Sequence, residues 1–334
     1  MINKLKSLTN TDDKKRLMSN FFSLSLLQMM NYLLPLLVIP YLFTTLGSEK
    51  FGLIAFAQAV VTYFSLFVNY GFNLSATREI SIHRDNTKKV SEIFSTVTTI
   101  KVIFLFTAFC IFNLIIYYVD KFSGDWKLYL FTFGMIIESI LFPMWFFQGM
   151  ERMKFITVIY TFSKIIVTVL IFMLIKGPDD YLMVPILYFI GSIISGALSI
   201  YVLFKLFQVY FIIPSFNQII FQLQDGWHLF ISNATINMYR NANILILGLM
   251  TTSIYVGYYA LVEKVIRALQ ALMAPVSETL YPYIAKKSTN QSLEKSLDGI
   301  VKISKYYAGI LIILSSCIFL FAPFIVYILS GEKI

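Results

Sequence analysis

Charged residues are scarce in this sequence. Asp, Glu, Lys and Arg make up only 13% of its 334 residues, whereas hydrophobic residues make up 58%. A soluble domain carries about 25% charged residues, so a sizeable soluble domain is excluded. Windows of about 20 apolar residues, the length needed to cross a bilayer, recur along the whole chain. The sequence therefore predicts an all-α polytopic membrane protein.

Cysteine and histidine, on which much catalysis and metal binding depend, number two each. Cys110 and Cys317 fall in apolar windows, so neither a disulfide nor a Cys/His metal site is expected. His83 lies in a charged loop and His228 near the end of a window, which leaves no histidine base within the membrane. No phosphate-binding loop or nucleophile elbow occurs. We expect no metal, no cofactor and no enzymatic activity, and energy from an ion gradient, the membrane potential or the cargo gradient.

Nine apolar windows are predicted to span the membrane. They cover residues 20–43, 54–77, 93–119, 126–149, 155–175, 181–208, 226–250, 253–280 and 305–329. With the N-terminus in the cytoplasm, the inside segments hold 17 Lys and Arg and the outside segments hold 5. Because Lys and Arg are enriched in cytoplasmic loops, we predict this orientation. The same enrichment accounts for the net charge of +9, so nucleic-acid binding is not expected.

Proline is concentrated in the predicted spans. Of the nine prolines, seven lie in or at the ends of these windows: Pro35, Pro40, Pro143, Pro185, Pro275, Pro282 and Pro323. Proline removes a helical hydrogen bond and kinks the helix. Kinked helices suit a protein that moves, although helix packing can equally accommodate them.

An internal repeat relates the second predicted span to the eighth. Residues 51–60 match residues 256–265 at a Gly, an Ala and a Val, and residues 110–112 recur as residues 317–319. Six spans separate the copies, so the halves would run parallel, as in transporters built from similar lobes. We expect a two-lobed bundle of parallel six-helix repeats: an N-terminal lobe at 1–208, a cytoplasmic linker at 209–225 and a partial C-terminal lobe at 226–334. On this reasoning the second lobe is truncated, with at least three helices missing.

Polar residues form a stripe along one face of each of these two spans. In the second span the stripe consists of Gln58, Thr62, Ser65, Asn69, Asn73 and Thr77. In the eighth span the corresponding face carries Glu263, Arg267, Gln270, Ala274 and Glu278. A charge at bilayer depth costs roughly 2.5–3.5 kcal/mol, so the face is expected to meet protein interior or a wet cavity rather than lipid.

Charged side chains are also predicted at depth in other spans. The seven deep charges are Lys101, Lys164, Arg240, Lys264, Arg267, Glu138 and Glu263. The excess of cations predicts an anionic cargo, such as a phosphate, held by Arg and Lys. Lys101 can instead snorkel to the interface. Glu138 and Glu263 either pair with the cations or exchange protons during a transport cycle.

A candidate cavity follows from the two stripes and the deep cations. The residues predicted to line it and bind substrate are Arg240, Lys264, Arg267, Gln58, Thr62, Asn69, Asn73, Gln270 and Lys164. The residues predicted for proton or ion coupling are Glu138, Glu263 and Glu278. Tyr239, Tyr258 and Tyr259 lie near the polar face and are candidates for stacking on sugar rings.

Several stretches carry the motifs of one family. They are FGL at 51–53, NYGFNLSATRE at 69–79, PMWFFQGME at 143–151, EKVIRA at 263–268 and LYP at 280–282. In this order they resemble bacterial polysaccharide flippases, the O-antigen translocases of the multidrug, oligosaccharidyl-lipid and polysaccharide exporter superfamily. Members usually have twelve or more spans, so this chain departs from them by ending after nine.

The resemblance implies two six-helix lobes around a central cavity in a multi-pass protein of the bacterial inner membrane. The implied activity is flipping of an undecaprenyl-diphosphate-linked oligosaccharide, the repeat unit of an O-antigen, capsule or exopolysaccharide, to the periplasmic leaflet. The implied partners are this lipid-linked oligosaccharide, membrane lipids, a polysaccharide polymerase and a chain-length regulator.

Two other classes of protein are alternatives. Another exporter of the superfamily, for multidrug or peptidoglycan-precursor lipid transport, would share the architecture, but a lumen for cationic drugs should be acidic. A membrane polysaccharide polymerase or acyltransferase would need a large periplasmic loop or an intramembrane histidine, and neither is visible in the sequence.

Overall fold

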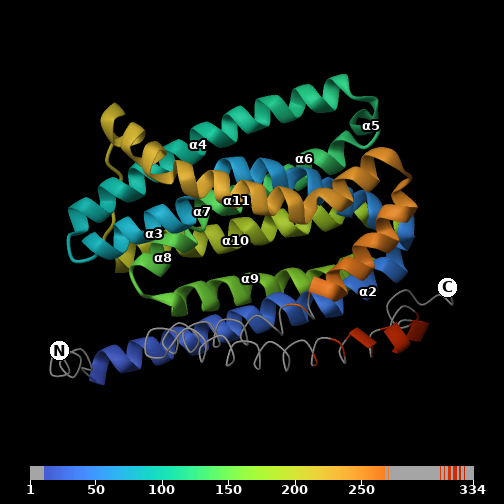
Figure 1. Cartoon of the computed structure of the whole chain (residues 1–334), viewed down its shortest axis with the longest axis horizontal. Helices are drawn as coiled ribbons and strands as arrows, with labels where there is room; N and C mark the ends of the chain where they lie inside the picture. Colours follow the sequence, from blue (N-terminus) through green and yellow to red (C-terminus); the bar gives the residue numbers. More distant parts are fainter. Residues whose placement is uncertain are drawn as a thin grey trace, which may run out of the picture.

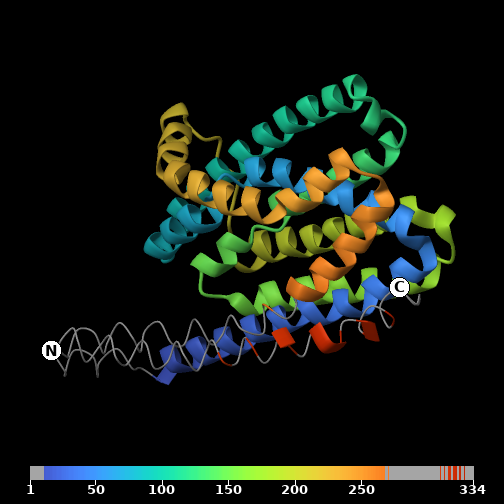
Figure 2. The same cartoon turned by 45° about the vertical axis from the view of Figure 1, so that its right-hand side comes forward.

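The computed structural model describes residues 11–267, residue 270 and ten scattered residues between 309 and 327, and the regular elements in this part of the chain are all helices (Figure 1). The long helices lie side by side along a common direction in two views of the molecule (Figure 1, Figure 2). This arrangement confirms the predicted all-α class. Glu278 and most of the ninth predicted span lie outside the described residues.

Five helical stretches of the described chain are long and apolar enough to cross a membrane. They are Leu26–His83, Thr87–Tyr118, Trp126–Gly149, Met153–Leu174 and Pro178–Leu206. These stretches correspond to the first six predicted spans, because Leu26–His83 holds two of them. The number of nine spans, the two lobes and the orientation stay predictions.

The first long helix, α2 (Thr11–Asn69), consists of two arms joined at Gly47. Gly47 has φ 79° and ψ 162°, a conformation that glycine adopts without a steric penalty. Figures 1 and 2 show the blue ribbon reversing there, so residues 11–46 (the first arm) and 48–69 (the second arm) run back along each other. The second arm leads through Tyr70 and Gly71 into α3 (Phe72–His83). We name the two ends of the bundle the Gly47 end and the Gly71 end.

The next helix, α4 (Thr87–Tyr118), is unbroken and is capped by Asn86, whose side chain accepts a hydrogen bond from the backbone N–H of Lys89. After the short α5 (Asp120–Ser123), the fourth predicted span is broken into pieces. These are α6 (Trp126–Gly134), the 3-10 helix η1 (Met135–Ile137), α7 (Glu138–Leu141) and α8 (Met144–Gly149). The break between α7 and α8 falls at Phe142 and Pro143. Pro143 has no N–H, so the carbonyl of Ser139, four residues earlier, loses its helical donor.

Lys101 of α4 supplies a replacement for that donor. Its ammonium donates to the carbonyl oxygen of Ser139 at 2.9 Å and to Oδ1 of Asn69 at 3.0 Å. The residue is only 1% exposed. Lys101 therefore does not snorkel to an interface; it joins the second arm, α4 and α7 inside the bundle.

The remaining long apolar helices are α9 (Met153–Leu174) and α10 (Met183–Leu206), with the 3-10 helix η2 (Pro178–Leu182) between them. The two helices pack closely enough for the Ser163 hydroxyl to donate a hydrogen bond to the carbonyl of Gly191 at 2.6 Å. On its other side α9 packs against the first arm, where the Tyr41 hydroxyl donates to the carbonyl of Ile175 at 2.6 Å.

The next long helix is α11 (Phe216–Met250), which Ser215 and Gln218 cap with a reciprocal pair of hydrogen bonds. Of the linker expected at 209–225, residues 216–225 are therefore the first turns of α11. The preceding segment is fixed to α4, because the backbone N–H groups of Tyr210 and Ile212 donate to serine hydroxyls of that helix. After Thr251 and Thr252 the chain turns into a further helical segment, residues 253–267.

Glycines allow close approach of α11 and segment 253–267 to α2 and α3. A Cβ added to Gly52 would lie 1.8 Å from the carbonyl oxygen of Ser253, and one added to Gly248 would lie 2.0 Å from the ring of Phe56. Both contacts are at the Gly47 end. At the Gly71 end, a Cβ on Gly71 would lie 2.9 Å from the backbone nitrogen of Phe230.

Candidate binding cavity

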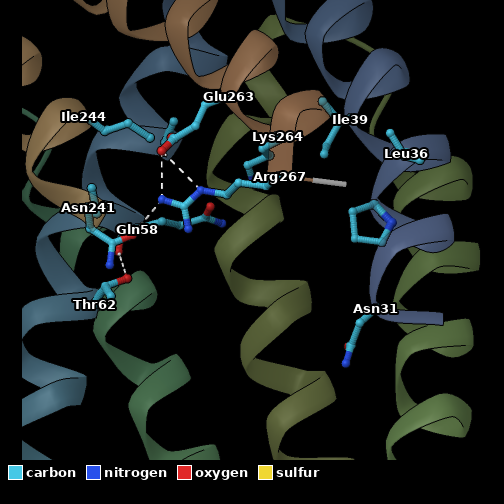
Figure 3. A pocket seen from close by; sticks show the side chains of 13 residues that line it. Asn31, Leu36, Ile39, Gln58, Thr62, Asn241, Ile244, Glu263, Lys264 and Arg267 are labelled. Atoms are coloured by element: carbon cyan, nitrogen blue, oxygen red, sulfur yellow. Dashed lines mark hydrogen bonds and ion pairs between the residues drawn. The ribbon is translucent and has the colours of Figure 1, made fainter. Parts of the chain in front are cut away.

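A cavity of about 300 Å³ lies between both arms of α2, α11 and segment 253–267 (Figure 3). Its lining is Asn31, Pro35, Leu36, Ile39, Ala55, Gln58, Ala59, Thr62, Asn241, Ile244, Glu263, Lys264 and Arg267. The first arm contributes mainly apolar side chains. The second arm, α11 and segment 253–267 contribute most of the polar and charged ones. The cavity therefore has one apolar wall and one polar, charged wall.

Arg267 is the most extensively bonded residue of the polar wall. Its Nε and Nη2 donate to Oε1 of Glu263 at 3.2 and 2.7 Å. Its Nη2 also donates to the backbone carbonyl of Arg240 at 3.0 Å and to Oδ1 of Asn241 at 3.1 Å. The spacing of four residues places Glu263 and Arg267 on the same helical face. These bonds orient the guanidinium toward α11, as Figure 3 shows.

Lys264 adds a second cation to the lining. Among the described residues its ammonium forms no hydrogen bond or close ion pair, and its charged neighbours are Glu263, Lys164 and Arg267. Two of these three neighbours are cations. The lining itself holds two cations, Lys264 and Arg267, and one anion, Glu263, so it has an excess of positive charge, and a bound anion would relieve the repulsion between the like charges.

Lys164 lies on α9, outside the cavity lining. Its ammonium is 5.1 Å from the ring centroid of Tyr160 and 5.6 Å from that of Tyr188. Glu138 of α7 lies within its electrostatic reach, and Ser195 Oγ donates to Oε1 of Glu138 at 3.5 Å. Lys164 and Glu138 thus interact electrostatically, and neither is part of the cavity lining.

The second-span stripe divides between two environments. Gln58 and Thr62 line the cavity, and the Thr62 hydroxyl donates to the carbonyl of Gln58 at 2.7 Å. Asn69 instead bonds to Lys101 and, through Nδ2, to the carbonyl of Ser65 at 2.9 Å. Asn73 is exposed and lies beyond the break at Gly71. The cavity therefore receives only the first two of the six stripe residues.

The other predicted residues lie at its margin or elsewhere. The side chain of Arg240 is exposed, and the residue contributes only its backbone carbonyl to Arg267. Gln270 is exposed and does not belong to the lining, while Glu278 is outside the described residues. The predicted roles of these residues stay predictions.

The three tyrosines proposed for sugar stacking also differ in position. Tyr239 is exposed on α11, and the Tyr259 hydroxyl accepts a hydrogen bond from Asn243 at 2.7 Å. Tyr258 packs against Phe43, with ring centroids 5.5 Å apart. None of the three lines the cavity as the described residues define it.

Sequence reasoning missed Asn31 and Asn241, which both line the cavity. Asn241 is the last of three asparagines spaced by four residues along α11. Nδ2 of Asn237 donates to the carbonyl of Asn233 at 2.8 Å, and Nδ2 of Asn241 donates to that of Asn237 at 2.9 Å. This spacing was the available signal for Asn241, whereas the prediction for this helix named its charged neighbour Arg240.

Membrane-length helices together with a polar, positively charged cavity define the class of multi-pass α-helical membrane proteins with an internal cavity. Residues 17–288 match the family described as polysaccharide biosynthesis protein. The chain belongs to this family, which confirms the resemblance to polysaccharide flippases. It is a multi-pass protein of the bacterial inner membrane.

Two relatives carry the printed name "Putative O-antigen transporter". The one from Escherichia coli (strain K12) is 29% identical over 273 residues, which is 82% of this chain and 66% of that protein. The one from Shigella dysenteriae is 31% identical over 269 residues, 80% of this chain and 67% of that protein. The matches thus span about two thirds of the relatives' lengths. No solved structure matches the chain. At the level of the family, the relatives' names agree with the expectation of a transporter rather than an enzyme.

Proposed function

We propose that this protein flips an undecaprenyl-diphosphate-linked oligosaccharide from the cytoplasmic to the periplasmic leaflet of the inner membrane. The observation that carries the proposal is the pair of cations, Lys264 and Arg267, in a cavity between α2, α11 and segment 253–267. The relatives' names, which refer to transport of O-antigen, support the class of cargo.

The lining suits the three parts of such a cargo. A diphosphate is bound by Arg and Lys, because their charged N–H groups form short, strong hydrogen bonds with phosphate oxygens. Sugar hydroxyls both donate and accept, and so do the side chains of Gln58, Thr62 and Asn241. The lipid tail needs no polar partner and can stay among the acyl chains or against the apolar wall around Leu36 and Ile39.

We further propose alternating access, with the N-terminus in the cytoplasm. In this orientation the Gly47 end is periplasmic and the Gly71 end is cytoplasmic. Each end has a contact that would have to open. At the Gly47 end the contact is that of Gly52 with Ser253, and at the Gly71 end it includes the ion pair between Arg78 and Asp225. Opening one contact at a time would expose the cavity to each side in turn.

The energy source in this proposal is an ion gradient acting on a half-buried carboxylate. Glu138, held near Lys164, is the candidate for proton exchange, because it is inside the bundle but apart from the cavity. A polysaccharide polymerase and a chain-length regulator are the proposed protein partners, which would receive the flipped cargo.

The test is transport by the complete protein in lipid vesicles that contain an undecaprenyl-diphosphate-linked oligosaccharide. The glycan that becomes accessible to an external glycosidase measures flipping. Replacement of Arg267 by Ala is expected to reduce the rate at least tenfold, because the principal phosphate ligand is lost. Arg84→Ala is the matched control, since Arg84 also pairs with a glutamate, Glu151, but outside the cavity.

Transport at the wild-type rate by Arg267→Ala would refute the proposed site. Vesicles loaded with a cationic drug address the alternative of multidrug export. Drug movement in the absence of glycan movement would favour that alternative. The excess of cations in the lining argues against it, because it would repel a cationic drug.

A further inference from the structure

We propose that Glu263 is the counter-ion of Arg267 in the absence of cargo. Its carboxylate occupies the edge of the guanidinium that binds phosphate, and the phosphate of the cargo displaces it. This inference deepens the proposed function and rests on it. It assigns Glu263 a role in setting the affinity for the cargo, in place of the two roles, cation partner or proton carrier, that the sequence left open.

The geometry of the pair carries the inference. Arg267 donates to Glu263 through Nε and Nη2, and both bonds end on the single oxygen Oε1. The Nε and Nη2 groups form one edge of the guanidinium, where two parallel N–H bonds can grip a phosphate. Glu263 therefore holds the same donors that a phosphate would need. The two anions cannot both bind this edge.

The surroundings allow the carboxylate to leave without loss of the site. The carbonyl of Arg240 and Oδ1 of Asn241 also accept from Nη2, and both belong to α11. They hold the guanidinium toward α11 independently of Glu263. The side chain of Arg267 is 43% exposed, so its donors are accessible from the cavity.

Charge favours the exchange once a diphosphate is present. A carboxylate carries one negative charge, whereas a diphosphate ester carries at least two. The diphosphate can also reach Lys264, which the described residues leave without a close ion pair and which lies beside Arg267. The carboxylate then limits the affinity, because it competes for Arg267 and repels the bound phosphate. A transporter needs such a limit, since cargo that binds too tightly cannot be released.

The test is binding of farnesyl diphosphate to the purified complete protein, measured by calorimetry, with farnesol as the blank for binding of the tail. Glu263→Gln removes the competing charge and keeps the size of the side chain. It is expected to bind the probe roughly tenfold more tightly than wild type. Glu263→Ala is a second variant with the same expectation, in case one variant fails to fold.

Two controls separate the possible outcomes. Glu92→Gln removes a carboxylate that pairs with Lys89 outside the cavity, so its affinity should equal that of wild type. Arg267→Ala should lose the binding. If both Glu263 variants bind no more tightly than wild type while Arg267→Ala loses binding, the counter-ion role is overturned and the proposed function stands. If Arg267→Ala binds as wild type does, the phosphate site itself is refuted, and the counter-ion role with it.

Discussion

The ammonium of Lys101 lies 2.9 Å from the carbonyl oxygen of Ser139, the carbonyl that Pro143 leaves without a helical donor. A buried lysine on α4 thus replaces the hydrogen-bond donor that a proline removes from another helix. The second bond of the ammonium, to Asn69, ties the same point to the second arm of α2. The break in the fourth span is therefore a supported feature of the bundle.

Replacement of Lys101 by Met is expected to destabilise the protein by about 2–3 kcal/mol, because it leaves two buried oxygens without donors. Pro143→Ala restores an N–H that can bond to Ser139. In a protein that already carries Pro143→Ala, the Lys101→Met substitution should therefore lower the free energy of unfolding by about 1 kcal/mol less. Unfolding in detergent of both single variants and the double variant measures the coupling. Strict additivity would contradict the link between Lys101 and Pro143, and Lys88→Met, at an exposed position, controls for the loss of a lysine.

Replacement of Gly52 by Ala should separate the second arm from segment 253–267, because the added Cβ would lie 1.8 Å from the carbonyl oxygen of Ser253. Overpacking of this kind costs about 1–3 kcal/mol. We expect a lower melting temperature and slower transport. Gly124→Ala is the control, since a Cβ at Gly124 meets nothing within 4 Å. Equal melting temperatures for the two variants would show that the close approach of the two backbones at Gly52 does not contribute to stability.

Replacement of Lys264 by Met should raise stability and abolish transport together. The desolvation of its ammonium and the repulsion from Lys164 and Arg267 oppose the charged form, and the attraction of Glu263 offsets them only in part, so removal of the charge should yield a gain of about 1 kcal/mol. The site, however, loses one of the two cations that are proposed to bind the cargo. Thermal unfolding and vesicle transport give the two readouts. A stable variant that still transports at the wild-type rate would remove Lys264 from the site.

Replacement of Asn241 by Ala should weaken transport about tenfold, since Arg267 loses one of the two acceptors on α11 that orient it. Asn113→Ala is a close control. Both asparagines donate through Nδ2 to the carbonyl four residues earlier, at 2.9 Å for Asn241 and 2.8 Å for Asn113, but Asn113 lies on α4 away from the cavity. Similar transport by the two variants would mean that Asn241 serves only its own helix.

Much of the fold was accessible from the sequence, because lipid imposes a simple rule. Every backbone polar group must be satisfied within the membrane, so each long apolar window had to become a helix. The C-terminal ends of the third, fifth and sixth windows accordingly lie within a few residues of the C-terminal ends of α4, α9 and α10. The break at Pro143 followed from its missing N–H. The donor that relieves the break could not be predicted, because Lys101 is about 40 positions away in the sequence and reaches Ser139 only through packing.

The site was only half accessible, and the reason is geometric. Helical spacing shows which residues share a face, so Gln58 with Thr62 and Glu263 with Arg267 could be grouped from the sequence. It does not show what each part of that face meets. Asn69 lies on the face of Thr62, yet it bonds to Lys101, whereas Asn241, which was not among the predicted site residues, lines the cavity.

The sequence by itself determined the apolar helices and the presence of cations at depth, since both depend on composition and local spacing. Only the tertiary structure decided which cation meets which partner. That choice depends on where the helices cross, and the crossings are set by packing between residues that are far apart in the chain.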